Sequence, residues 1–182
     1  MKTYEKNINN LKKLPEAIKE SINCESNVQL MAREFLSANG SMFLGRGSSF
    51  PIALEGALKL KELSYLHAEG YPAGEMKHGP LALIEEGLPV IILAPKDKYF
   101  KKTLSNMQEV IARGGKILFI TDNKKELLNE NIRFGLRIPY LDNLLSPILL
   151  TVPLQILAYH VALLKNCDVD KPRNLAKSVT VE

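Results

Sequence analysis

Short runs of apolar residues alternate along this chain with stretches in which apolar residues recur every three or four positions. Four runs predict strands buried in a parallel sheet, at residues 42–44, 89–94, 116–121 and 134–138. Helical spacing predicts helices over residues 15–24, 27–38, 51–66, 99–113 and 146–164, with the last bent or broken at Pro153. This alternation predicts an α/β fold, a three-layer α/β/α sandwich around a parallel sheet of four or five strands.

The two ends of the chain differ from its middle. Residues 1–13 are polar and lysine-rich, which indicates an arm or linker ahead of the first helix. We therefore expect residues 1–25 to form the arm and first helix, residues 26–167 the domain, and residues 168–182 a C-terminal tail.

Within helix 51–66 we expect partial burial of the larger side chains, Ile52, Leu54, Leu58, Leu63 and Leu66.

Composition narrows the class of protein. The 182 residues, 46% of them hydrophobic and 24% charged, fit one globular domain with a full core. The net charge is only +4 and the lysines are scattered, so we expect no nucleic-acid partner. Cys24 and Cys167 are isolated cysteines and the N-terminus is polar, which together favour a reduced, cytoplasmic protein without a secretory leader.

One uncharged segment, residues 143–164, is long enough to span a bilayer. Its polar and helix-breaking residues would need partners in hydrocarbon, and they are Pro147, Pro153, Gln155 and His160. We therefore expect a buried helix and no membrane partner. Metal binding is not expected either, because the three histidines and two cysteines lack the spacing of metal ligands. No cofactor is expected.

A glycine-rich turn follows the first predicted strand. Gly45-Arg46-Gly47 leads to Ser48 and Ser49 at a helix start, an arrangement that presents backbone N–H groups to a ligand in many α/β proteins. The two serines have two interpretations, phosphate binding or capping of the helix. Parallel sheets bind ligands beyond the carboxyl ends of their strands, where residues 45–49, 94–95 and 121–122 are expected to meet.

Several motifs closely resemble the C-terminal sugar isomerase (SIS) domain of glucosamine-6-phosphate synthases, the isomerising glutamine–fructose-6-phosphate amidotransferases. They are Gly-Arg-Gly at 45–47, Ala-Leu-Glu-Gly-Ala-Leu-Lys-Leu-Lys-Glu at 53–62, Ala-Gly-Glu-Met-Lys-His-Gly-Pro at 73–80, and residues 168–182. The resemblance covers almost the whole chain. It implies the flavodoxin-like SIS fold, and it makes residues 168–182 an active-site tail.

The resemblance also gives Glu62 a role. Glu55, Lys59 and Glu62 share one helix face, which by itself indicates a solvated stripe of ion pairs. In the family, the residue matching Glu62 is the base that moves a proton between C1 and C2 of the sugar, which requires a carboxylate near both carbons. Lys59 would stabilise the anionic form.

Three further roles follow from the resemblance. His78 matches a histidine that opens the sugar ring and reaches the site of a neighbouring subunit, so a homodimer is expected. Lys177 matches the lysine that forms a Schiff base with the C2 ketone of fructose 6-phosphate. Amine attack needs the free base, and Arg173 could lower the lysine pKa. The backbone of Ala176 would lie along the sugar. We expect these groups to converge at the mouth of the sheet, while His67 and His160 are structural.

We therefore expect the second isomerase domain of a glucosamine-6-phosphate synthase, incomplete alone, whose partners are the first SIS domain and a glutaminase domain. In that family the other SIS domain holds the phosphate, which favours capping for Ser48 and Ser49. One alternative is a stand-alone phosphosugar isomerase or deglycase in which both serines bind phosphate. The other is a sugar-phosphate-binding module without catalysis.

Overall fold

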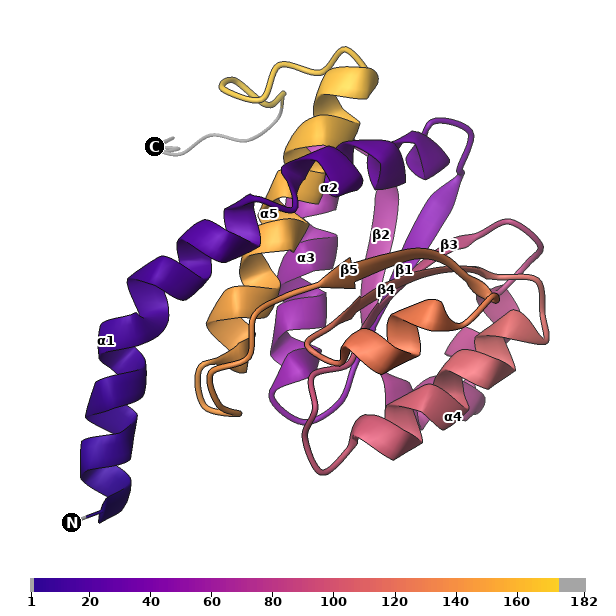
Figure 1. The fold of residues 1–182 in the computed structure, drawn as a ribbon. Helices are drawn as coiled ribbons and strands as arrows, with labels where there is room; N and C mark the ends of the chain where they lie inside the picture. Colours follow the sequence, from indigo (N-terminus) through magenta and orange to yellow (C-terminus); the bar gives the residue numbers. More distant parts are fainter. Residues whose placement is uncertain (1, 174–182) are drawn as a thin grey trace, which may run out of the picture.

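The computed structural model describes residues 2–173, and within them the chain forms a layered α/β domain (Figure 1). The α-helices are α1 (Lys2–Ile22), α2 (Glu25–Ala32), α3 (Ser49–Ser64), α4 (Phe100–Ile111) and α5 (Ser146–Leu164). The strands are β1 (Gly40–Gly45), β2 (His67–Pro72), β3 (Pro89–Leu93), β4 (Lys116–Thr121) and β5 (Ile132–Arg137). Short 3-10 helices are η1 (Arg33–Phe35), η2 (Ala73–His78), η3 (Pro80–Leu83) and η4 (Lys124–Leu128).

The five strands described form one parallel sheet in the order β2-β1-β3-β4-β5. This is the flavodoxin-like order, in which the chain leaves β1 in one direction along the sheet and later returns to β3 on its other side. The predicted α/β/α sandwich with a parallel sheet of four or five strands is therefore confirmed, with five.

Helices cover both faces of the sheet, which is why the central strands are continuous apolar runs. Phe43 of β1 packs with α1, α2, α3 and α5, whereas its neighbours Met42 and Leu44 point to the opposite layer, with α4, η2 and η3. All five residues of β3 are buried. Each large apolar side chain buried in this way contributes about 1.5–3 kcal/mol.

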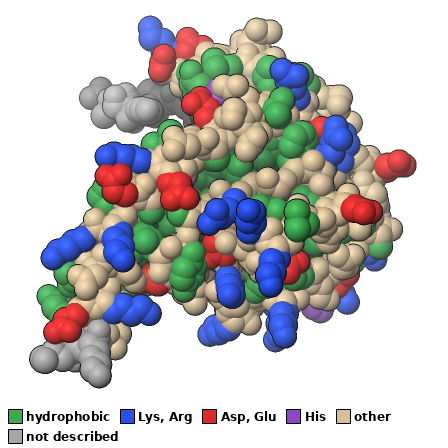
Figure 2. Space-filling model, viewed as in Figure 1, with side chains coloured by type: hydrophobic (Ala, Val, Ile, Leu, Met, Phe, Trp, Pro, Cys, Tyr) green, Lys and Arg blue, Asp and Glu red, His purple; other side chains and the backbone are tan. Residues whose placement is uncertain are grey.

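The predicted arm over residues 1–13 is part of α1, one helix that begins at Lys2 and contains Pro15, so the first helix starts earlier than the predicted residue 15. Its second half packs on the domain through Ala17 and Ser21, which are buried. Farther toward the N-terminus, Asn10 donates a hydrogen bond to Asp142 (Nδ2–Oδ2 2.6 Å). Acidic and basic side chains are interspersed along the exposed surface of α1 (Figure 2). The polar sequence thus reflects a helix covered on one side only.

The strand β2 has no counterpart in the sequence-based prediction. It lies at the edge of the sheet and contains few apolar residues, and Ala68 is its fully buried member. Gly70 is required by packing: a Cβ there would lie 2.8 Å from the Leu54 Cα of α3. The helix therefore lies almost directly on this strand.

Leu54 and Leu58 are 45% and 42% exposed, in agreement with the predicted partial burial. The fully buried positions of α3 are small residues, among them Ala53 and Ala57. Helix α5 continues through Pro153 without a break. This helix is long and apolar enough to cross a membrane. However, half of its apolar stretch is buried inside the domain, where it packs against α2 and α3. Its position as a core helix accounts for its apolar sequence.

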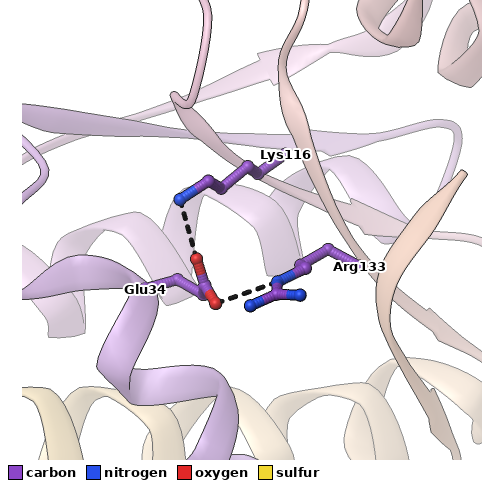
Figure 3. Close-up of polar contacts among 3 residues, drawn as sticks. All are labelled: Glu34, Lys116 and Arg133. Carbon is purple, nitrogen blue, oxygen red and sulfur yellow. Dashed lines mark hydrogen bonds and ion pairs between the residues drawn. The ribbon is translucent and has the colours of Figure 1, made fainter.

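Glu34 of η1 joins the helices to the far strands of the sheet. Its side chain, 11% exposed, lies between Lys116 of β4 (Nζ–Oε2 2.8 Å) and Arg133 of β5 (Nε–Oε1 3.0 Å) (Figure 3). Burial acts to raise the pKa of Glu34, but the hydrogen bonds from the two cations outweigh it and hold the pKa below its ordinary value.

This cluster predicts a pH-dependent contribution to stability. Glu34→Gln should lower the free energy of unfolding by about 1–2 kcal/mol at pH 7, because hydrogen bonds to charged partners are lost. A lowered native pKa stabilises the fold above the unfolded pKa, roughly 4.3, and this contribution disappears as the pH falls through the native value. Urea unfolding at pH 7 and near pH 3 should therefore give a smaller difference from wild type at the lower pH.

Glu16→Gln is the matched control, because Glu16 forms an exposed ion pair with Lys19. It should change the free energy of unfolding by less than about 0.5 kcal/mol. A wild-type urea midpoint for Glu34→Gln at pH 7 would contradict the assignment.

Candidate functional site at the end of α3

The two ends of α3 lie at opposite edges of the sheet. Strands β1 and β2 are parallel, so the helix that connects them must run back from the carboxyl ends of the strands to their amino ends. Ser49 begins α3 at the carboxyl edge, and Glu62 lies in its last turn at the amino edge. Thirteen residues of helix separate them by about 20 Å. Glu62 therefore lies at the edge of the sheet opposite the glycine-rich turn and Ser49.

Glu62 and Lys59 form a close pair in the last turns of α3. Lys59 Nζ lies 2.6 Å from Glu62 Oε2 and 4.0 Å from Glu55 Oε1, so the predicted common face of the three side chains is confirmed. The side chains of Lys59 and Glu62 are 33% and 27% exposed. The hydrogen bond to Glu62 raises the pKa of Lys59 above its ordinary value, which keeps this lysine cationic. The pair thus presents a proton acceptor with a cation beside it.

The last described residues of the chain return to this end of α3. Tyr65, directly after the helix, accepts a hydrogen bond from the Arg173 backbone N–H (N–Oη 2.7 Å). The Arg173 guanidinium lies 4.1 Å from the centre of the Tyr65 ring. Figure 1 shows the end of α5, in yellow, at the same end of the molecule as α2. Ala176 and Lys177 lie outside the described residues.

A polar cavity of about 590 Å³ opens beside this contact. Its lining comes from the end of α3 and the segment after α5: Ser64, Tyr65, Lys165, Asn166, Cys167, Asp168, Lys171 and Arg173. Sequence reasoning found Arg173 but missed Tyr65. A tyrosine after a helix carries no signal by itself, and its partner is 108 residues away in the sequence.

His78 lies at the opposite edge of the sheet. It ends η2, which follows the carboxyl end of β2, and its imidazole is 76% exposed and 3.7 Å from Glu75. Arg46 lies against the start of η2 and donates a hydrogen bond to Asn106 of α4 (Nε–Oδ1 3.1 Å). A Cβ at Gly74 would lie 3.0 Å from the Arg46 guanidinium, so Gly74 allows this close approach. The Gly-Arg-Gly turn thus lies against the segment that carries His78.

In the described part of the chain, neither Ser48 nor Ser49 caps α3 with its side chain. Ser48 occupies the N-cap position in a helical conformation, and its hydroxyl makes no capping hydrogen bond there. Ser49 is 1% exposed, and its hydroxyl has no hydrogen-bond partner among the described residues. The preferred capping interpretation is therefore wrong. A cavity of about 310 Å³ lies nearby, lined by Gly47, Ser48, Asp97, Lys98, Tyr99 and Asn143.

Histidine and cysteine side chains form no obvious metal site. No group of three or more His, Cys, Asp or Glu residues within residues 2–173 is placed to hold a metal ion. His160 is 9% exposed, and its Nε2 lies 2.9 Å from Glu25 Oε1, so it joins α5 to α2. This contact agrees with a structural role for His160.

Comparison with known proteins gives a consistent picture. The chain is 51% identical over 176 residues to the isomerising glutamine–fructose-6-phosphate aminotransferase of Bartonella henselae, which covers 96% of this chain and 29% of that protein. The C-terminal domain of glucosamine-fructose-6-phosphate aminotransferase from Francisella tularensis superposes with a TM-score of 0.89 at 42% identity, over 94% of this chain and 49% of that one. Glucosamine-6-phosphate deaminase from Thermotoga maritima has a TM-score of 0.66 at 26% identity, covering 94% and 48%.

The chain thus spans less than a third of the aminotransferases that it matches in sequence. Residues 34–165 match the family of the SIS domain, which is most of the described structure. The strand order, the helices on both faces and this match agree, and the chain belongs to the SIS domain family.

Proposed function

We propose that this chain is the second isomerase domain of a cytoplasmic glucosamine-6-phosphate synthase. It would contribute to the conversion of fructose 6-phosphate and glutamine-derived ammonia into glucosamine 6-phosphate. The observation that carries the proposal is the Lys59–Glu62 pair (2.6 Å). It lies at the same edge of the sheet as the contact between Arg173 and Tyr65. The identity to the aminotransferase of Bartonella henselae supports the same assignment.

The proposed chemistry joins Glu62 and Lys177. The unprotonated Nζ of Lys177 adds to the C2 ketone of fructose 6-phosphate, and water leaves as the Schiff base forms. Ammonia then replaces the lysine at C2. Glu62 takes a proton from C1 and returns it to C2, while the proton of the C1 hydroxyl moves to the nitrogen on C2. The C2=N double bond is thereby replaced by C1=O without net oxidation. Lys59 stabilises the negative charge that develops during this transfer.

The position of His78 supports a site that two copies of the chain complete together. His78 and Glu62 of one chain lie at opposite ends of the six-residue strand β2, on the order of 20 Å apart. A single copy therefore does not bring this imidazole to its own Glu62. In the proposed homodimer, His78 opens the sugar ring in the site of the other subunit, where its imidazole can both donate and accept a proton. The first SIS domain and a glutaminase domain supply phosphate binding and ammonia.

The Schiff base can be trapped. Treatment with fructose 6-phosphate and borohydride, in the presence of the remaining part of the Bartonella henselae aminotransferase as a separate polypeptide, should attach one reduced sugar phosphate to Lys177. Peptide mass spectrometry locates the adduct. Lys177→Arg should abolish it because a guanidinium is not a nucleophile, while Lys171→Arg, the control, should retain it. Equal labelling of the Lys177→Arg variant would refute the proposal.

Glu62→Gln separates proton transfer from binding. In the same reconstituted enzyme, exchange of the C1 hydrogen with solvent deuterium should slow about 10²–10⁴-fold, the usual contribution of a general base. Formation of the Lys177 adduct should persist, because it does not need this carboxylate. The control is Glu55→Gln, because Glu55 lies two turns before Glu62 and 4.0 Å from Lys59. An equal loss of exchange in both variants would show that Glu62 has no special role.

The serines distinguish the proposed function from its main alternative. The cavity beside Ser48 favours a stand-alone phosphosugar isomerase or deglycase, in which Ser48 and Ser49 hold the phosphate. In the synthase, the double variant Ser48→Ala/Ser49→Ala should change the affinity for fructose 6-phosphate by less than about threefold, because the other SIS domain holds the phosphate. Calorimetric titration measures this. Loss of all binding would support the alternative.

A further inference from the structure

Tyr65 has a backbone conformation that is unusual for an aromatic residue. It follows α3 with φ 59° and ψ 12°, in the left-handed region, and its N–H donates to the carbonyl of Lys61 (3.1 Å). Glycine or asparagine usually occupies this position at a helix end, because a larger residue meets steric cost there. A tyrosine is tolerated here at the expense of local strain, which indicates that its side chain makes a compensating contact.

That contact joins Tyr65 to Arg173 in two ways. The phenol oxygen accepts a hydrogen bond from the Arg173 backbone N–H at 2.7 Å. The ring supports the Arg173 guanidinium, 4.1 Å from the ring centre, in a cation–π arrangement. One side chain thus fixes both the backbone and the charged end of Arg173.

The segment between α5 and Arg173 is shaped to reach Tyr65. Asn166, at φ 55°, follows the end of α5, and the Cys167 N–H donates to the Ala162 carbonyl (2.9 Å). Asp168 then turns the chain back, because its Oδ1 accepts hydrogen bonds from the backbone N–H groups of Asp170 and Lys171, both at 3.0 Å. Three residues after Asp170, the chain meets Tyr65. The segment 165–173 is therefore tied to the domain at Cys167 and at Arg173, and Asp168 shapes the turn between them.

We propose that Tyr65, which lies three residues after Glu62, is a positioning residue. By holding Arg173, it fixes the point from which the chain continues to Lys177. This inference rests on the proposed function for the role of Lys177, but the contact between Tyr65 and Arg173 stands independently of it. Four residues from Arg173 to Lys177 span at most about 14 Å. Without the Tyr65 contact, the last residue tied to the domain becomes Cys167, ten residues before Lys177. Because effective concentration falls as about the −3/2 power of tether length, Lys177 would be about fourfold more dilute at Glu62.

The test uses the 182-residue chain with Tyr65→Gly and Tyr65→Phe, and with Tyr140→Gly as an exposed control. Glycine removes the side chain but favours the left-handed backbone, so the melting temperature should not fall. Trypsin cleavage after Arg173 is followed by mass spectrometry of the peptides that begin at Asn174. Cleavage should be about tenfold faster in Tyr65→Gly, because both contacts to Arg173 are lost. Tyr65→Phe, which keeps the ring, should be intermediate, and Tyr140→Gly should match wild type.

The second measurement is the rate of Lys177 adduct formation with fructose 6-phosphate and borohydride in the reconstituted enzyme. It should fall about fourfold or more in Tyr65→Gly. Unchanged cleavage after Arg173 in Tyr65→Gly would overturn the anchoring contact. Faster cleavage with an unchanged adduct rate would overturn the positioning role. Absence of any Lys177 adduct in the wild type would instead refute the proposed function and the positioning of Lys177 with it, while the cleavage rates would still decide whether Tyr65 holds Arg173.

Discussion

Parallel pairing of β1 with β2 is the constraint on which the arrangement of this domain depends. A helix between two parallel neighbours must cross the sheet from one edge to the other. Helix α3 therefore places the glycine-rich turn with Ser48 at one edge and the Lys59–Glu62 pair at the other. Parallel α/β sheets usually bind ligands at the first of these edges. In this domain the close pair of a carboxylate and a cation, Glu62 and Lys59, lies at the other edge, beside the amino ends of the strands.

Both helices that pack at the centre of the domain end at this second edge. The packing of α3 against α5 brings their C-terminal ends together, so the segment after α5 begins beside the residues that follow α3. The contact of Arg173 with Tyr65 and the proximity of Cys167 to Ser64 are consequences of that packing. Arg173 thus reaches Tyr65, three residues after Glu62, because of how the core is packed, although more than 100 residues separate the two in the sequence.

The sequence predicts the elements that are decided by burial. β3 and β4 are apolar runs because helices cover both of their faces, and their prediction is confirmed. β2 escaped prediction because an edge strand needs few apolar residues, and α1 because a helix covered on one side resembles a polar arm. At the site, helical spacing predicts the shared face of Lys59 and Glu62. The Tyr65–Arg173 contact and the separation of Ser48 from Glu62 depend on topology, which local patterns do not encode.

The residues of β2 also explain why the sheet stops there. An edge strand exposes unpaired backbone groups that invite another chain to extend the sheet. His67 and Glu69 place a polar pair on this strand (Nε2–Oε1 3.3 Å), and Pro72 at its end lacks the N–H that further pairing would need. The features that hid β2 from the apolar pattern are therefore the ones that discourage strand-to-strand aggregation of the folded domain. The low apolar content of β2 thus limits pairing with strands of other molecules.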